Sequence, residues 1–172
     1  MPESKTRLGK LAISPLQTGD DARACARLMA ASEPWLTLGR SYELSLDIIQ
    51  DPSREVYVAW DESGLAGFLI LCMTGALVGY IQTVCIDPAR RGQGLGSQLV
   101  DFAEQRILRV SPNVFMCVSS FNRDARRLYE RLGYKVIGEL TDYIVRGHSE
   151  FLLRKTLGPL TGFGSKVTGR TS

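Results

Sequence analysis

Hydrophobic and polar residues follow two different periods along this chain. Strict alternation predicts strands, whereas a repeat of three to four residues predicts helices. Strands are expected at Leu11–Leu16, Glu55–Trp60, Leu65–Met73, Leu77–Ile86, Val114–Val118, Tyr134–Ile144 and Glu150–Leu157. Helices are expected at 20–31, 41–50 and 95–110, and from Asn122 to Gly133. This order predicts an α/β (α+β) fold, with a mixed, mostly antiparallel sheet of about seven strands and helices on both faces.

The length of 172 residues suits one domain with a core of its own. The periodic pattern covers residues 11–157, which we expect to form that single domain. Residues 1–10 are polar and carry charges of both signs, and residues 158–172 are rich in Gly, Ser and Thr. Both ends are therefore expected to be flexible.

One uncharged stretch, 64–86, is long enough to span a bilayer. Glycines interrupt it repeatedly, and Thr74-Gly75 lies near its middle. Two buried strands joined by a tight turn account for this pattern better than a membrane helix. The sequence therefore predicts no membrane span here, and the polar first ten residues do not predict a signal peptide.

Charge and cysteine content exclude several classes of protein. The net charge of +3 is slight, and no basic stripe with interleaved aromatic residues is present, so a nucleic-acid partner is not expected. The single histidine, His148, excludes a site that needs two. The four cysteines, Cys25, Cys72, Cys85 and Cys117, lack metal-ligand or redox spacing, which predicts buried thiols, no metal and a cytoplasmic location.

The stretch DPARRGQGLG, residues 87–96, follows a predicted strand and precedes a predicted helix. No Lys-Ser or Lys-Thr follows its glycines, which excludes the phosphate loop of nucleotide hydrolases. Ser97 replaces the third glycine of a dinucleotide fingerprint, and the strand before it belongs to hairpins rather than to a parallel unit. Glycines let successive N–H groups converge on an anion, and Arg90 or Arg91 adds charge, so the stretch suits a pyrophosphate.

A second segment, SSFNRDARRLYERLGYKVIGEL at 119–140, completes a pattern with the first. The glycine stretch matches [QR]-x-x-G-x-[GA], and the second segment matches N-x-x-A-x-x-x-Y-x-x-x-G-[FY]. Its matching positions are Asn122, Ala125, Tyr129, Gly133 and Tyr134. Together, in this order and context, they resemble the two cofactor motifs of the GNAT acetyltransferase superfamily.

The resemblance implies that acetyl-CoA is the co-substrate. In the family the fourth and fifth strands splay apart, and the pantetheine arm pairs with the fourth strand like an added strand. The pyrophosphate would lie on residues 91–97, and the backbone N–H of Cys85 or Ile86 would polarise the acetyl carbonyl. The implied cofactor-binding residues are Val84, Cys85, Ile86, Arg91, Gly92, Gln93, Gly94, Leu95, Gly96, Ser97 and Asn122.

The family's chemistry is direct attack of a neutral amine on the thioester. Tyr129 occupies the general-acid position and would protonate the leaving sulfur. Cys117 stands where some relatives have a glutamate, so the base stays open among Glu33, Glu43, Asp87, Asp142, a water chain and an amine that arrives neutral. A covalent relay through Cys85 or Cys117 is disfavoured, because no histidine or lysine is placed to lower a thiol pKa.

The acceptor is expected to bind at the loop 32–43 and the hairpin 143–149. Candidate substrate-binding residues are Glu33, Trp35, Tyr42, Glu43 and Tyr143. The acceptor would be a primary amine, on a small molecule or on a protein lysine or N-terminus, and a homodimer stays open. The main alternative is a catalytically silent acyl-CoA-binding sensor on the same fold.

Overall fold

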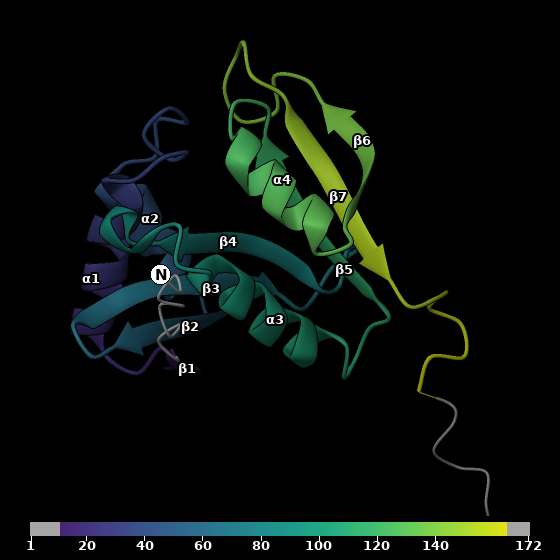
Figure 1. Ribbon diagram of the computed structural model, residues 1–172, viewed down its shortest axis with the longest axis horizontal. Helices are drawn as coiled ribbons and strands as arrows, with labels where there is room; N and C mark the ends of the chain where they lie inside the picture. Colours follow the sequence, from purple (N-terminus) through teal and green to yellow (C-terminus); the bar gives the residue numbers. More distant parts are fainter. Residues whose placement is uncertain (1–10, 165–172) are drawn as a thin grey trace, which may run out of the picture.

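The computed structural model describes residues 11–164 of the chain (Figure 1). The predicted flexible segment 1–10, and residues 165–172 of the predicted tail, lie outside the described residues. The strands are β1 (Ala12–Pro15), β2 (Arg54–Asp61), β3 (Gly64–Cys72), β4 (Tyr80–Ile86), β5 (Asn113–Ser119), β6 (Lys135–Leu140) and β7 (Glu150–Thr156). The helices are α1 (Gly19–Ala30), α2 (Tyr42–Gln50), α3 (Leu95–Ile107) and α4 (Arg123–Arg131), with a 3₁₀ turn, η1, at Pro88–Arg90.

All seven strands form one sheet in the order β1-β2-β3-β4-β5-β7-β6. Every neighbouring pair is antiparallel except β4 and β5, which are parallel. This arrangement confirms the predicted mixed, mostly antiparallel sheet. The parallel pair joins a half made of β1 to β4 to a half made of β5, β7 and β6.

Helices cover both faces of the sheet, as the sequence predicted (Figure 1). Residues of α1 and α2 pack with β2 and β3 around the buried Phe68 and Ile70. On the other face, α3 and α4 pack on β3 to β5 around Leu69, Leu71 and Val114. Because β3 reads GLAGFLILC, with apolar residues at adjacent positions, it supplies buried side chains to both faces.

Side chains cap three of the helices at their N-termini. The Thr18 hydroxyl accepts a hydrogen bond from the Asp21 N–H at the start of α1. The Ser41 hydroxyl accepts one from the Leu44 N–H at the start of α2. Asn122 caps α4 by accepting from the Ala125 N–H over 3.4 Å, which confirms the predicted cap. In contrast, α3 starts after Gly94 with no side-chain cap.

Two predicted strands are shorter in the structure by three residues or more. β4 begins at Tyr80 rather than Leu77, because Gly75 and Gly79 adopt positive φ values of 89° and 86° and form a turn before it. β6 ends at Leu140 rather than Ile144, because a turn follows in which Asp142 accepts a hydrogen bond from the Gly147 N–H over 2.6 Å. Residues 141–149 therefore form a loop beside the sheet.

Gly79 is expected to be required for the start of β4. A Cβ there would lie 2.7 Å from the Asn113 carbonyl oxygen, whereas a Cβ on Gly75, with a similar φ, would meet nothing within 4 Å. Gly79→Ala should lower the free energy of unfolding by about 2–5 kcal/mol, from backbone strain plus overpacking. Gly75→Ala should cost about 1–2 kcal/mol from strain alone. Urea denaturation of both variants tests this difference, and equal losses would contradict it.

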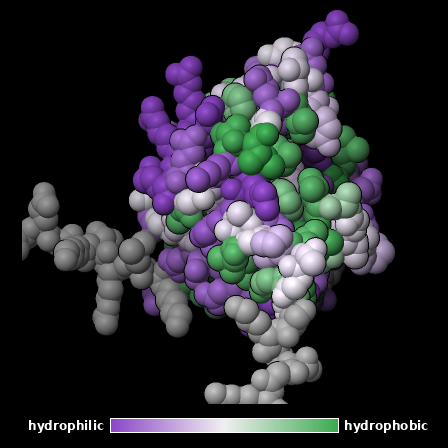
Figure 2. Space-filling model, turned by 90° about the vertical axis from the view of Figure 1, so that its right-hand side faces the viewer, coloured by the Kyte–Doolittle hydropathy of each residue, from purple (hydrophilic) through white to green (hydrophobic). Residues whose placement is uncertain are grey.

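The β6 edge carries two exposed apolar residues, Val136 and Ile137. Figure 2, viewed from the right-hand side of Figure 1, shows apolar groups separated by hydrophilic ones on that face of the molecule. Within residues 11–164, none of the helices combines the length and the apolar character needed to cross a bilayer. The uncharged stretch 64–86 forms β3, a turn and β4, as predicted.

Candidate active site

β4 and β5 are hydrogen-bonded neighbours over a short distance only. Their register holds two pairs, Tyr80 with Phe115 and Ile81 with Met116. Within residues 11–164, no strand pairs with this edge of β4 beyond Ile81, and none pairs with the facing edge of β5 beyond Met116. The backbone groups of Val84 and Ile86, which face away from β3, are therefore placed to pair with an extended ligand.

A β-bulge lies where the two strands separate. Ile70 of β3 pairs with Thr83 and Leu71 pairs with Ile81, so Gln82 has no partner on β3. A bulge bends its strand and changes which side chains face each side of the sheet. It therefore turns β4 away from β5 at the point where the pocket opens.

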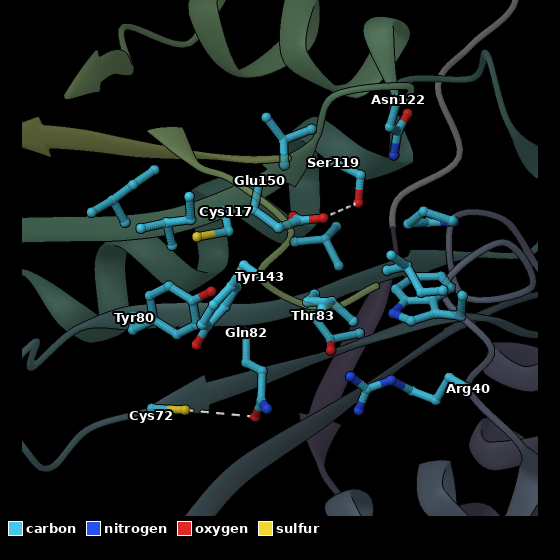
Figure 3. Close-up of a pocket in the computed structure, with 18 of the residues that line it drawn as sticks. Arg40, Cys72, Tyr80, Gln82, Thr83, Cys117, Ser119, Asn122, Tyr143 and Glu150 are labelled. Atoms are coloured by element: carbon cyan, nitrogen blue, oxygen red, sulfur yellow. Dashed lines mark hydrogen bonds between the residues drawn. The ribbon is translucent and has the colours of Figure 1, made fainter. Parts of the chain in front are cut away.

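The diverging strands enclose a pocket of about 800 Å³, which we call the interstrand pocket. Loops after α1, after β3 and after β6 complete its wall (Figure 3). It is lined by Met29, Pro34, Trp35, Leu38, Arg40, Cys72, Thr74, Leu77, Tyr80, Gln82, Thr83, Val84, Cys117, Val118, Ser119, Asn122, Tyr129, Leu140, Tyr143, Ile144, Glu150 and Leu152.

Tyr129, the predicted general acid, lines this pocket from α4. Its side chain is 9% exposed and belongs to the core on the α3 and α4 face. Burial raises the pKa of Tyr129 to about 12. The phenol therefore stays protonated at neutral pH and is able to donate its proton.

Glu150, the first residue of β7, also lines the pocket, and sequence reasoning missed it. It is 4% exposed, and its Oε1 accepts a hydrogen bond of 2.6 Å from Ser119 Oγ (Figure 3). Burial raises the pKa of the Glu150 carboxyl, an effect that the Ser119 hydrogen bond and His148 oppose. A buried carboxylate with a raised pKa is a suitable proton acceptor for an amine.

Tyr129 and Glu150 reach the pocket from different faces of the sheet. Val118 packs in the core under α3 and α4, so Ser119, the next residue along β5, points to the opposite face. Glu150 pairs with Ser119 across the two strands and shares its face. The pocket thus has the carboxyl group of Glu150 on one side and the phenol of Tyr129 on the other.

Two of the five residues predicted to bind the acceptor line the pocket, and three do not. Trp35 and Tyr143 are lining residues. Glu33 is exposed and accepts hydrogen bonds from Thr37, while Glu43 is exposed and Tyr42 packs against the α1 and α2 core. The structure therefore does not bring these three to the interstrand pocket.

The two other carboxylates considered as bases also lie away from the pocket lining. Asp87 forms an ion pair with Arg90, and Asp142 accepts from the Gly147 N–H. Both carboxylates have structural partners in the turns that contain them. Among the acidic residues that the structure describes, Glu150 is the one that lines the pocket.

The glycine-rich stretch forms the turn between η1 and α3. Gly92 and Gly94 both have φ values of 75°, a conformation that residues with a side chain rarely adopt. In the described part of the chain, the N–H groups of residues 92–97 donate to no protein acceptor. Unpaired N–H groups at the positive end of a 13-residue helix suit an anion such as a pyrophosphate.

The two arginines before these glycines have different roles. Arg90 pairs with Asp61 and Asp87 and donates to the Leu65 carbonyl oxygen, which fixes η1 to the β2–β3 hairpin. Its charge is therefore already neutralised by protein carboxylates. Arg91 is exposed and donates to the Glu33 carbonyl oxygen over 3.0 Å, so its positive charge is available to a ligand.

The cysteines are free thiols rather than disulfides or ligands. Burial raises the pKa of Cys85, which is fully buried, and also that of Cys117, which lines the pocket. Neither is activated as a nucleophile, in agreement with the sequence reasoning. Within residues 11–164, no three His, Cys, Asp or Glu side chains gather as metal ligands would.

The fold of this chain is similar to those of solved acetyltransferase structures. An aminoglycoside 6'-N-acetyltransferase complexed with coenzyme A superposes with a TM-score of 0.69 at 17% identity, covering 86% of this chain and 98% of that one. Spermidine N-acetyltransferase from Vibrio cholerae, in complex with CoA and spermine, gives a TM-score of 0.67 at 19% identity, covering 85% and 95%. These likenesses confirm the predicted fold.

Sequence comparison identifies the family. The model of the Acetyltransferase (GNAT) family matches residues 22–134, and the chain belongs to this family. Peptidyl-lysine N-acetyltransferase YjaB of Salmonella typhimurium is 32% identical over 105 residues, which are 59% of this chain and 66% of that protein. The chain spans between 54% and 66% of the length of three curated relatives it matches.

Proposed function

We propose that this protein transfers an acetyl group from acetyl-CoA directly to a primary amine. The observation that carries the proposal is the placement of Tyr129 and Glu150 in one pocket between diverging strands. Family membership supports acetyl transfer in general. The four free cysteines support a cytoplasmic location.

Glu150 is the base in this proposal. An amine is protonated at neutral pH and attacks only after it loses a proton. Glu150 takes that proton, directly or through one water molecule, and the neutral nitrogen then forms a bond to the thioester carbon. The raised pKa of Glu150 brings its proton affinity closer to that of an amine, which favours this transfer.

Tyr129 is the acid. When the carbon–sulfur bond breaks, the departing sulfur gains a pair of electrons, and Tyr129 donates its phenolic proton to it. The backbone N–H of Ile86, on the edge of β4 beyond its pairing with β5, stabilises the negative charge on the carbonyl oxygen. The N–H of Cys85, the other candidate from the sequence, faces β3 instead, because the Asp87 N–H donates to the Ala66 carbonyl oxygen and backbone groups alternate along a strand.

The attacking nitrogen still carries a second proton and a positive charge after the bond forms, and it loses that proton to solvent as the amide is released. Solvent also returns a proton to Tyr129 and removes one from Glu150, so one proton is released overall.

Acetyl-CoA supplies the activated thioester, and its pyrophosphate is held by residues 91–97. The exposed Arg91 is expected to contribute charge. Arg91→Ala should raise the Kd for coenzyme A about tenfold, measured by isothermal titration at low salt. The matched control is Arg109→Ala, which removes an equally exposed arginine beyond the other end of α3. Equal losses in the two variants would contradict a local role for Arg91.

Thiol release from acetyl-CoA over a panel of amines tests the function. Transfer, confirmed by mass spectrometry of the acetylated amine, supports the proposal. Binding of coenzyme A in the titration without release on any amine would instead support the sensor alternative. The panel should contain polyamines, lysine peptides, amino acids and simple alkylamines, because relatives are named for acceptors as different as peptidyl lysine and spermidine.

A further inference from the structure

Arg40 is a charged group in the interstrand pocket that the reaction above does not use. It follows the loop after α1, half-buried, and its backbone N–H donates to the Trp35 carbonyl oxygen over 3.0 Å. Figure 3 shows its guanidinium pointing from this loop into the pocket, toward Thr83. Trp35, to which the backbone of Arg40 is hydrogen-bonded, belongs to the α1 and α2 core, so Arg40 lies on the same face of the sheet as that core.

The guanidinium of Arg40 has no partner in the described protein. Among residues 11–164, no acceptor or carboxylate contacts its side chain. Burial lowers the pKa of Arg40, and no neighbouring carboxylate opposes that effect. Burying part of an unpaired charge costs free energy, and a ligand that brings a negative charge recovers it.

The charges of the whole pocket restrict the class of acceptor further. Of the described residues that line it, two are charged, Arg40 and Glu150. Figure 3 shows Glu150 with Ser119 near the middle of the view and Arg40 at one side, with Thr83 between them in the projection. A pocket with one carboxylate and one guanidinium complements a molecule that carries one amine and one anionic group.

On the basis of the proposed function, we infer that the acceptor is a small amine that also bears a carboxylate or phosphoryl group. Arg40 binds the anionic group with a charge-assisted, bidentate hydrogen bond. Glu150 faces the amine. Polyamines and aminoglycosides are disfavoured, because each additional cation would meet Arg40 rather than a second carboxylate.

This inference is tested with pairs of acceptors that differ only in whether they carry the anionic group. The panel contains α-, β- and γ-amino acids, each compared with its own amide. It also contains aminoalkyl phosphates and spermidine. Initial rates of thiol release give kcat and KM for the wild type, Arg40→Gln and Arg40→Lys. Arg27→Gln is the matched control, because it removes an exposed arginine of α1 that does not line the pocket.

We expect the best amino-acid acceptor to have a kcat/KM about 10- to 100-fold higher than that of its amide. Arg40→Gln should remove this preference by raising KM for the acid, with kcat on the amide and KM for acetyl-CoA unchanged. Arg40→Lys should restore part of the preference, because a lysine keeps the charge but not the bidentate geometry. Arg40→Gln should also leave the unfolding midpoint unchanged or raised, whereas a structural arginine would lower it. The kcat/KM of carboxylate acceptors is compared with that of phosphate acceptors. The class that loses more kcat/KM in Arg40→Gln identifies the anionic group that Arg40 binds.

Three results would overturn the inference while leaving acetyl transfer intact. These are faster reaction of amides or spermidine than of acids, equal losses on acid and amide in Arg40→Gln, and a raised KM for acetyl-CoA in that variant. A raised KM for acetyl-CoA would indicate that Arg40 binds the coenzyme rather than the acceptor. Absence of transfer to every acceptor, acid and amide alike, would overturn the proposed function and this inference together.

Discussion

Replacing Glu150 by glutamine is expected to lower kcat by about 10²- to 10⁴-fold, with KM for acetyl-CoA unchanged. An amide has nearly the same size as the carboxyl group, and it still accepts the hydrogen bond from Ser119 Oγ. It cannot take a proton from an ammonium group. The loss should therefore be chemical rather than structural, and circular dichroism and the unfolding midpoint should match the wild type.

The pH profile gives an independent test of Glu150. Because burial raises its pKa, the carboxylate becomes protonated at a higher pH than an exposed glutamate does. The wild-type kcat/KM should fall as the pH decreases through that raised pKa, and Glu150→Gln should lack this step. The matched control is Glu139→Gln, an exposed carboxylate on β6. An acidic step that persists in Glu150→Gln would assign the base to another group.

Removing the phenolic hydroxyl in Tyr129→Phe is expected to lower kcat by about 10²- to 10⁴-fold, again with little change in the affinity for acetyl-CoA. The ring that packs in the core under α4 is retained, so the fold should persist. Since the pKa of Tyr129 is raised to about 12, its deprotonation should produce no loss of activity below about pH 10.

Two further measurements separate acid catalysis from packing. Tyr134→Phe makes the same chemical change on a neighbouring ring, whose centroid is 6.2 Å from that of Tyr129, and should leave kcat unchanged. A thioester with a more acidic thiol needs less protonation as it leaves, so Tyr129→Phe should lose less activity on such a substrate. Equal losses on both thioesters, or in both tyrosine variants, would remove Tyr129 from the role of acid.

Local features of this protein were predictable from sequence because their causes are local. Asn122 caps α4 through an N–H three residues away, and the Gly92 and Gly94 turn has its positive φ values within the motif itself. The spacing of apolar residues likewise located seven strands and four helices with small errors at their ends. The larger errors fell at β4, β6 and the end of α3, where turns end these elements although the apolar pattern continues past them.

Regions of the site built from distant segments were not predictable in this way. Glu150 and Ser119 are 31 positions apart, and their contact depends on the register of β5 with β7. The one signal was the spacing of Glu150 and Leu152, which places a carboxylate on the same strand face as an apolar residue. Glu33 and Glu43 suited the expected chemistry by residue type, yet neither lines the pocket.

The sequence by itself determined the order of elements and the glycine-rich turn before α3, and its second motif singled out Tyr129 as the candidate acid, since all three depend on residues near one another along the chain. The tertiary structure alone decided that Glu150 and Arg40 line one pocket and that Arg90 is neutralised by Asp61 and Asp87. It also decided the pKa shifts of Glu150 and Tyr129. The physical reason is that burial and pairing of charges depend on which distant segments pack together, and residue spacing carries no information about that.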